Sequence, residues 1–423
     1  MCSLVRTNGV PAATRLIWAR LRQADAAAML GRGPIARLVE TDAFSARSVP
    51  CFAGNIALIG SLDLAQCRKF RVIQKQEMIE CVAGQQIRIS HYRDIYRSRS
   101  LLQSADKLVL YRVPNGAHFN EIIAEARRLG LGVCYDIDDP VFDLETVKSN
   151  PNLSFLSRQM QRALFRDAVV FSEAMRQCDI ITVSTPGLRR LVNQRFPSIP
   201  CYVIPNGVDA ETIHYGAVAR HQGLPSHDRP FRILMPSGSL AHAADTEVAV
   251  EGVRRFLDRC PEAQIVTIGH FHPEYALRNA NAVKTLPFLP YSEYMRLLAT
   301  ADCVLVPLAE SVFNDGKSIA RLIDATEVGV PVVASPIGEY AEAALSSAFF
   351  PARSPTEWCE ALEIIAQCGG EKSRVVRAAL QRVRAPRLLS SLWANLDPEL
   401  RAFFGSRAPS PSSPLVEAGA PGE

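Results

Sequence analysis

Short apolar segments alternate with amphipathic stretches along most of this chain, and this alternation restricts its fold more than any other feature. Apolar runs of about four to eight residues predict buried strands, and the stretches between them are long enough for helices. Strands are expected at 55–62, 86–91, 107–112, 132–136, 179–184, 201–204, 231–235, 263–268, 283–286, 303–308 and 330–334. Helices are expected at 65–82, 96–103, 119–129, 153–177, 186–195, 245–259, 292–299, 340–344, 355–366 and 388–404. This pattern predicts an α/β fold with parallel sheets joined by right-handed crossovers.

The length of 423 residues favours two domains, and residues 214–230, which have little periodicity, mark the boundary between them. We expect a helical extension (1–52), an N-terminal Rossmann-like domain (53–213), a C-terminal Rossmann-like domain (214–390), a last helix (391–405) and a disordered tail (406–423). Two doubly wound sheets would face each other across a cleft, and ligands of such folds bind at the carboxyl ends of the strands.

Composition excludes several classes of protein. A hydrophobic content of 48% and a charged content of 21% are ordinary for a globular enzyme, and a net charge of +4 does not suggest a nucleic-acid partner. The 11 cysteines form no CxxC pair, which favours a reduced, cytoplasmic chain without a metal centre. No apolar run is long enough to span a membrane, and no signal peptide is recognisable. The Arg-rich amphipathic stretch Thr14–Leu30 could rest on the inner membrane face or pack against the first domain.

The segment 313–335 combines a loop, a helix and a buried strand. Ile319, Leu322 and Ile323 form an apolar stripe at helical spacing, and Gly329 is expected to end the helix. Asn314 or Asp315 is expected to cap its N-terminus. Because the start of a helix carries partial positive charge, the sequence predicts a phosphate site here.

A second interpretation of the same segment is a P-loop. The run 311–318, SVFNDGKS, has Gly316, Lys317 and Ser318 at P-loop spacing, but Ser311 stands where a P-loop needs glycine. An NTPase that uses Gly316, Lys317 and Ser318 is therefore the alternative hypothesis.

Three carboxylates gather where the expected strand 132–136 ends. Asp136, Asp138 and Asp139 could orient the hydroxyls of an acceptor or act as a base. The alternative for Asp138 or Asp139 is a helix cap before Pro140.

Several motifs together resemble the GT-B glycosyltransferases, and in particular their large retaining group four. The motifs are SGS at 237–239, PNGVD at 205–209 and DATEVGVPVVAS at 324–335, and the resemblance covers about residues 53–390. A subgroup with FN, two variable residues and KS is most similar, and Phe313, Asn314, Lys317 and Ser318 fit it. The segments CRKFRV at 67–72 and YDIDD at 135–139 are also similar to that subgroup.

The resemblance implies that Asp324 accepts hydrogen bonds from the ribose hydroxyls of a donor nucleotide. The alternative is an exposed pair between Asp324 and Arg321 on one helix face. Family members carry a second acidic residue, which contacts the donor sugar, where this chain has Gly316. Asp315, or the backbone amides of 314–316, would have to replace it.

The remaining donor contacts are also inferred from the resemblance. Lys317 and Ser318 would meet the diphosphate, and Gly238 and Ser239 would let the backbone approach it. His242 would contact the diphosphate or the acceptor, with a capping or solvent-exposed role as the alternative.

The function implied is transfer of a sugar from a UDP-, GDP- or ADP-linked donor to an acceptor hydroxyl, with retention and without a metal or other cofactor. Asp138, Asp139 and Lys317 are the catalytic candidates, and the acceptor would be a saccharide or a lipid-linked saccharide. Because Gly316 replaces the acidic residue, a non-catalytic nucleotide-sugar binding protein remains a third hypothesis.

Overall fold

The computed structural model describes residues 54–405 except 223–228, 239–241 and 270–281. The expected extension (1–52), the expected tail (406–423) and Ser239 lie outside the described residues. Among the helices of the described part, none is both long enough and apolar enough to cross a lipid bilayer.

The first sheet has six parallel strands in the order β2-β1-β3-β4-β5-β6. Its strands are β1 Asn55–Gly60, β2 Gln86–His91, β3 Lys107–Tyr111, β4 Gly132–Ile137, β5 Ile180–Val183 and β6 Cys201–Val203. The central strands were predictable from their apolar runs, because both faces of the sheet are buried there, whereas the edge strand β2 has an exposed residue, Arg88. Ala57 and Ile59 belong to the core on one face, and Ile56 and Leu58 to the core on the other.

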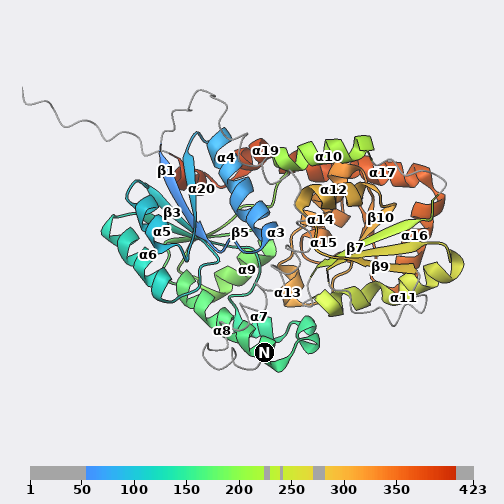
Figure 1. Ribbon diagram of the computed structural model, residues 1–423, viewed down its shortest axis with the longest axis horizontal. Coiled ribbons are helices and arrows are strands. Elements are labelled where there is room, and N and C mark those ends of the chain that lie inside the picture. The colour runs from blue at the N-terminus through green and yellow to red at the C-terminus, as the bar shows by residue number, and fades with distance from the viewer. Residues whose placement is uncertain (1–53, 223–228, 239–241, 270–281, 406–423) are drawn as a thin grey trace, which may run out of the picture. The chain divides into compact units, whose positions relative to one another are not determined.

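The second sheet also has six parallel strands, in the order β12-β11-β10-β7-β8-β9. Its strands are β7 Arg232–Gly238, β8 Gln264–Gly269, β9 Val283–Leu286, β10 Cys303–Val306, β11 Val332–Ala334 and β12 Phe350–Pro351. The direction of strand addition reverses between β7 and β10, so the carboxyl ends of these two strands border the place where such sheets bind ligands. The expectation of two doubly wound domains is confirmed (Figure 1).

Helices cover both sheets (Figure 1). The N-terminal domain contains α3 Ala65–Arg68, the π-helical turn η3 Lys69–Ile73, α4 Gln74–Val82, α5 Ile95–Leu102, α6 Ala117–Arg128, α7 Leu144–Lys148, the 3-10 helix η4 Pro151–Phe155, α8 Arg158–Met175 and α9 Pro186–Arg195. The C-terminal domain contains α10 Ala210–Gln222, α11 Ala243–Arg259, α12 Tyr291–Ala299, α13 Val312–Asp315, α14 Ala320–Val328, α15 Glu339–Ala344, α16 Pro355–Gln367, α17 Gly369–Ala379, η8 Leu380–Arg384 and α18 Ala385–Arg387.

The expected linker at 214–230 is wrong in its first part, because α10 continues to Gln222 and packs against α12 and α14. Val208 and Ala219 already belong to a core of the C-terminal domain. The apolar residues of α10 are spread around the helix instead of forming one stripe, which explains why periodicity did not reveal it.

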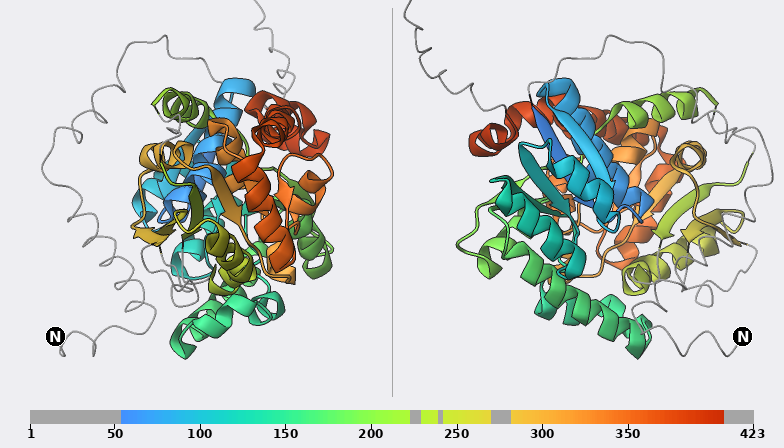
Figure 2. Two further views of the ribbon diagram at one scale, coloured as in Figure 1. Left: turned by 90° about the vertical axis from the view of Figure 1, so that its right-hand side faces the viewer. Right: turned by 60° about the vertical axis from the view of Figure 1, so that its left-hand side comes forward.

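The chain returns to the N-terminal domain at its end through α19 Leu389–Asn395 and α20 Pro398–Phe404. Leu392, Leu396 and Leu400 share a core with residues of β1. Both views of Figure 2 show these red helices beside the blue elements of the N-terminal domain. The single helix expected at 388–404 is two helices, because Asp397 caps a new helix whose first residue is Pro398.

Candidate functional site

Loops that follow the strands of the first sheet meet the segment that follows β10. The hydroxyl of Thr185 donates to the backbone oxygen of Gly316 at 3.0 Å. The side-chain amide of Asn206 donates to the hydroxyl of Ser318 at 2.9 Å. The ammonium group of Lys317 lies 2.9 Å from Oδ1 of Asp139. The structure therefore brings Asp139 and Lys317 together, although they come from different domains.

Arg112 holds both neighbouring carboxylates. Its Nε donates to Asp138 at 2.6 Å and its Nη2 donates to Asp139, while the hydroxyl of Tyr111 also donates to Asp138 at 3.1 Å. Arg112 has a φ of 47°, an unfavourable backbone conformation for a residue with a side chain and one that is often found at functional sites. Nothing in its sequence context distinguishes Arg112, which directly follows β3.

The surroundings of Asp139 keep its carboxylate charged. Burial alone would raise the pKa of Asp139, but the positive charges of Lys317 and Arg112 outweigh burial and hold the pKa well below its usual value. A carboxylate of such low basicity is a poor general base but a good hydrogen-bond acceptor. The capping alternative is wrong, because the helix after Pro140 is α7 and Asp143 caps it.

Asp136 does not lie with the other two carboxylates. It is fully buried, with salt bridges to Arg71 at 2.6 Å and Lys75 at 2.8 Å and a hydrogen bond from Thr182 at 2.7 Å. Burial would raise its pKa, but Arg71 and Lys75 lower the pKa of Asp136 to about 2. The position of Asp136 gives no support to the expected acceptor role, since the carboxylate is fully buried and paired with Arg71 of η3 and Lys75 of α4.

The buried side chain of Asn314 stabilises the loop that follows β10. Its side chain is fully buried and donates to Asp245 at 2.6 Å and to the backbone oxygen of Ala309 at 2.8 Å. The expected cap at Asn314 or Asp315 is wrong, because Ser311 caps the short helix α13 and no side chain caps α14. Asn314 therefore fixes the loop instead of ending a helix.

The start of α14 already holds a carboxylate. Glu339 accepts a hydrogen bond from the backbone N–H of Ile319 at 3.1 Å and from Arg387 at 2.9 Å. An acidic side chain thus occupies part of the site where the sequence predicts a phosphate. In the P-loop interpretation, residues 311–318 would have to wrap around a phosphate, but here they contain the helix α13 and pack against Thr185.

Gly316 is required by close packing between the two domains. A Cβ atom added at Gly316 would lie 2.9 Å from Cδ2 of Leu188, which is fully buried. One added at Gly187 would lie 2.0 Å from the backbone oxygen of Asp315. The acidic side chain that the resemblance leads us to expect at position 316 would have to displace the buried side chain of Leu188.

Asp324 lies on α14 but is buried, with 4% of its surface exposed. The hydroxyl of Tyr291 donates a hydrogen bond to Asp324 at 2.8 Å. The ammonium group of Lys69 lies over the ring of Tyr291, 4.0 Å from the ring centre. Burial raises the pKa of Asp324 to about 7, against the hydrogen bond from Tyr291 and the charge of Lys69. The alternative pair with Arg321 is wrong, because no such ion pair forms between these two described residues.

His242 directly precedes α11 and is oriented by a buried carboxylate. Its Nδ1 lies 3.0 Å from Oδ2 of Asp245, which also accepts a hydrogen bond from the backbone N–H of Ala309. Burial lowers the pKa of His242, which favours the neutral ring with its proton on Nδ1. The side chain does not cap α11. Gly238 is the last residue of β7, so the strand extends three residues beyond the expected end at 235.

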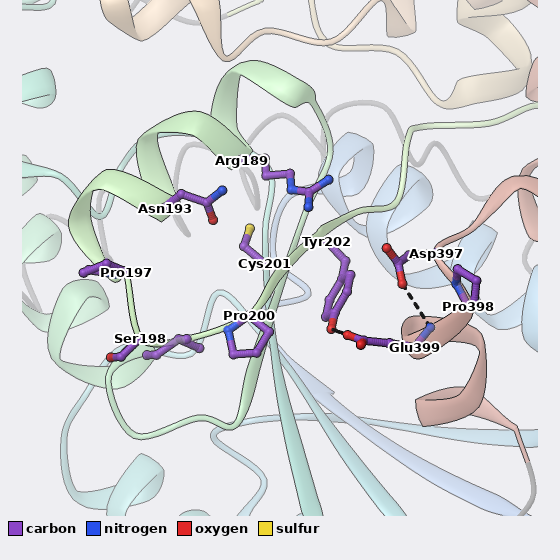
Figure 3. A pocket seen from close by; sticks show the side chains of 11 residues that line it. Arg189, Asn193, Pro197, Ser198, Pro200, Cys201, Tyr202, Asp397, Pro398 and Glu399 are labelled. Carbon is purple, nitrogen blue, oxygen red and sulfur yellow. Dashed lines mark hydrogen bonds between the residues drawn. The ribbon is translucent and has the colours of Figure 1, made fainter.

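A separate groove of about 800 Å³ lies between α9, β6 and the start of α20. Figure 3 shows Arg189, Asn193, Tyr202 and Glu399 around it, with Tyr202 hydrogen-bonded to Glu399. The groove borders the first residue of β6, at the amino end of the strand, whereas Asp139 and Lys317 follow the carboxyl ends of strands. The two places are therefore distinct.

Solved structures with the same two-domain arrangement are found by comparison, although no family model and no curated protein matches the sequence. Sucrose-phosphate synthase from Thermosynechococcus elongatus matches with a TM-score of 0.53 and 14% identity, over 80% of this chain and 96% of that one. Anabaena HepE in complex with UDP matches with a TM-score of 0.53 and 12% identity, over 80% and 97%. WaaG, a glycosyltransferase involved in lipopolysaccharide biosynthesis, matches with a TM-score of 0.54 and 11% identity, over 79% and 97%. The chain thus has the GT-B fold of two Rossmann-like domains.

Proposed function

We propose that this protein is a glycosyltransferase that moves a sugar from a nucleotide-sugar donor to an acceptor hydroxyl, with retention at the anomeric carbon. The contact that carries the proposal is the 2.9 Å pair between Asp139 and Lys317. It joins a carboxylate that follows β4 to a cation that follows β10, at the ends of strands where doubly wound sheets bind their ligands. A fold shared with HepE in complex with UDP and with the glycosyltransferase WaaG supports the same proposal.

The two domains would bind different substrates. The C-terminal domain would bind the donor, with Lys317 and Ser318 near its diphosphate and Asp324 near its ribose. The N-terminal domain would bind the acceptor, and Asp138 and Asp139 would accept hydrogen bonds from its hydroxyls. Because Arg112 and Lys317 hold the pKa of Asp139 low, we assign Asp139 to orientation instead of proton abstraction.

Proton transfer would then fall to the donor itself. No protein nucleophile is required if the departing diphosphate takes the proton of the acceptor on the same face of the sugar. Stabilisation of the negative charge on that diphosphate would be the main contribution of the protein to the rate. We propose that the reaction needs no metal, that the donor carries UDP, GDP or ADP, and that the acceptor is a saccharide or a lipid-linked saccharide in the cytoplasm.

Binding and turnover together test the proposal. Thermal unfolding is measured with UDP, GDP, ADP and ATP, each with and without Mg²⁺, and the stabilising nucleotide is then offered as a nucleotide sugar while release of the nucleotide is followed. We expect one nucleoside diphosphate to stabilise the protein and its sugar derivative to be consumed. The variant Lys317→Ala should show a smaller stabilisation, whereas Lys284→Ala, a change at an exposed lysine of β9, should keep it in full. A preference for ATP with Mg²⁺, together with ATP hydrolysis, would favour the NTPase hypothesis instead.

A second candidate is a non-catalytic nucleotide-sugar binding protein. It is favoured by one observation, the packing of Leu188 at the position where an acidic side chain would contact the donor sugar. Nucleotide-sugar binding without consumption of the donor, across a panel of saccharide acceptors, would support this candidate over the enzyme.

A further inference from the structure

Arg321 is a partly buried cation, and the residues that the structure describes provide no counter-ion for it. It lies on α14, and it makes no hydrogen bond or ion pair with any residue in the described part of the chain. A charged side chain is costly to bury unless a group of opposite charge compensates it. An unpaired guanidinium in such a position therefore favours an anionic ligand.

Arg321 lines a narrow crevice at the switch point of the second sheet. The crevice also includes Pro236 from β7, Pro307 directly after β10, His242 before α11, and the carboxylate of Asp245 on α11. The strand order reverses between β7 and β10, and ligands of doubly wound sheets enter at this reversal. The cation is thus placed where the fold itself favours binding.

The two basic residues near Arg321, Lys317 and His242, are less able than Arg321 to bind an anion. Lys317 lies four residues earlier in the sequence, before the first residue of α14, and its ammonium group is paired with Asp139. Burial lowers the pKa of His242, against the hydrogen bond to Asp245, and the charges of Lys317 and Arg321 lower it further, which disfavours a positive charge on this ring. The carboxylate of the crevice, Asp245, is hydrogen-bonded to His242, Asn314 and the backbone N–H of Ala309, and it forms no ion pair with Arg321. Arg321 consequently supplies a positive charge that no described side chain pairs with.

We propose that Arg321 is the principal cation for the diphosphate group of the donor, ahead of Lys317. This inference rests on the function proposed above and assigns its anion site to a residue that the sequence motifs did not mark. The guanidinium presents a planar fork of N–H donors that fits two phosphate oxygens at once, which a lysine ammonium cannot reproduce. Lys317 would contribute secondarily, because a phosphate must compete with Asp139 for it.

Isothermal titration of the full chain with inorganic pyrophosphate and with the preferred nucleoside diphosphate tests the assignment. Three variants are compared with the wild type. Arg321→Gln removes the charge, and Arg321→Lys keeps the charge but not the fork. Arg377→Gln makes the same change at an exposed arginine of α17 and is the matched control.

We expect Arg321→Gln to weaken both ligands about ten- to hundredfold, the range for loss of a charge-assisted contact, and Arg321→Lys to weaken them less. The melting temperature of Arg321→Gln should stay at the wild-type value, since the side chain has no partner to lose. Arg377→Gln should bind like the wild type.

The outcomes separate this inference from the proposed function. If the wild type binds and consumes a nucleotide sugar while Arg321→Gln binds the diphosphate as tightly as Arg377→Gln, the assignment of Arg321 is overturned alone. Weaker binding of pyrophosphate with unchanged binding of the nucleotide would also overturn it, because the crevice would then hold an adventitious ion only. If the wild type binds neither pyrophosphate nor any nucleoside diphosphate and consumes no donor, the proposed function fails with it.

Discussion

Nζ of Lys317 lies 2.9 Å from Oδ1 of Asp139, and this contact joins residues 178 positions apart in the sequence. Both side chains are about one-fifth exposed, so water screens the pair only in part. Arg112 approaches the same carboxylate from the other side. The pair therefore links the two domains at the proposed site and can be tested as a coupling between them.

A double-mutant cycle measures that coupling. We expect Lys317→Met and Asp139→Asn to show a coupling of about 1 kcal/mol in the free energy of unfolding, determined from urea titrations at low salt. The exposed pair Lys148 and Glu145 on α7 is the control, for which a few tenths of a kcal/mol is expected. A coupling of zero between positions 139 and 317 would mean that the pair contributes nothing to the stability of the folded protein.

The central strands of this protein could be predicted from the sequence because they are buried on both faces. Leu58 of β1 and Val109 of β3 lie in apolar runs that a doubly wound sheet requires. The strand β12 has only two residues, too few for any periodic signal. The helix α10 escaped detection because its apolar residues do not share one face.

Site residues could be predicted from the sequence only where neighbouring residues form a recognisable motif. Asp139 and Lys317 were found because each stands at the end of a regular element, next to a recognisable motif. Arg112 and Tyr291 were missed, since their importance comes from partners distant in the sequence. The burial of Asp136 was missed for the same reason, because its counter-ions lie on a different helix.

Asp136 is expected to stabilise the fold instead of acting on a substrate. Asp136→Asn leaves the buried Arg71 and Lys75 without a counter-ion, so the free energy of unfolding should fall by about 3–5 kcal/mol. Chemical denaturation followed by circular dichroism checks this value. Glu371→Gln, which breaks an exposed pair on α17, is the control and should change stability by less than about 1 kcal/mol. If Asp136→Asn keeps the stability of the wild type but loses turnover, Asp136 acts in the reaction instead.

Gly187 is expected to be intolerant of any side chain. The added Cβ of Gly187→Ala would lie 2.0 Å from the backbone oxygen of Asp315, and a backbone atom cannot turn aside as a side chain can. We expect a loss of about 1–3 kcal/mol in unfolding free energy, the usual cost of overpacking. Gly369→Ala places the same methyl group in open space on α17 and should leave stability unchanged or slightly higher. Equal stability of the two variants would show that the two domains do not pack at Gly187.

Asp324 should make stability depend on pH. Burial raises its pKa in the folded protein from 3.8 to about 7, so between these values the folded protein binds a proton that the unfolded chain has released. Stability from this group is fully present below about pH 4, falls as the pH rises, and is lost above about pH 7, with a total of up to about 4 kcal/mol. Asp324→Asn keeps an oxygen that can accept the hydrogen bond from Tyr291 but cannot ionise, so it should remove this dependence.

The measurement is the difference in unfolding free energy between the wild type and Asp324→Asn, obtained from urea titrations at several pH values from 4.5 to 8.5, about the interval set by the two pKa values. Taking the difference cancels the titration of all other groups, provided that they do not interact with Asp324. The wild type should become less stable relative to the variant as the pH rises toward 7, with no further change above it. Asp258→Asn on α11 alters a solvent-exposed carboxylate and is expected to show a flat difference over the same interval. A flat difference for Asp324→Asn as well would mean that burial does not raise the pKa of this carboxylate in solution.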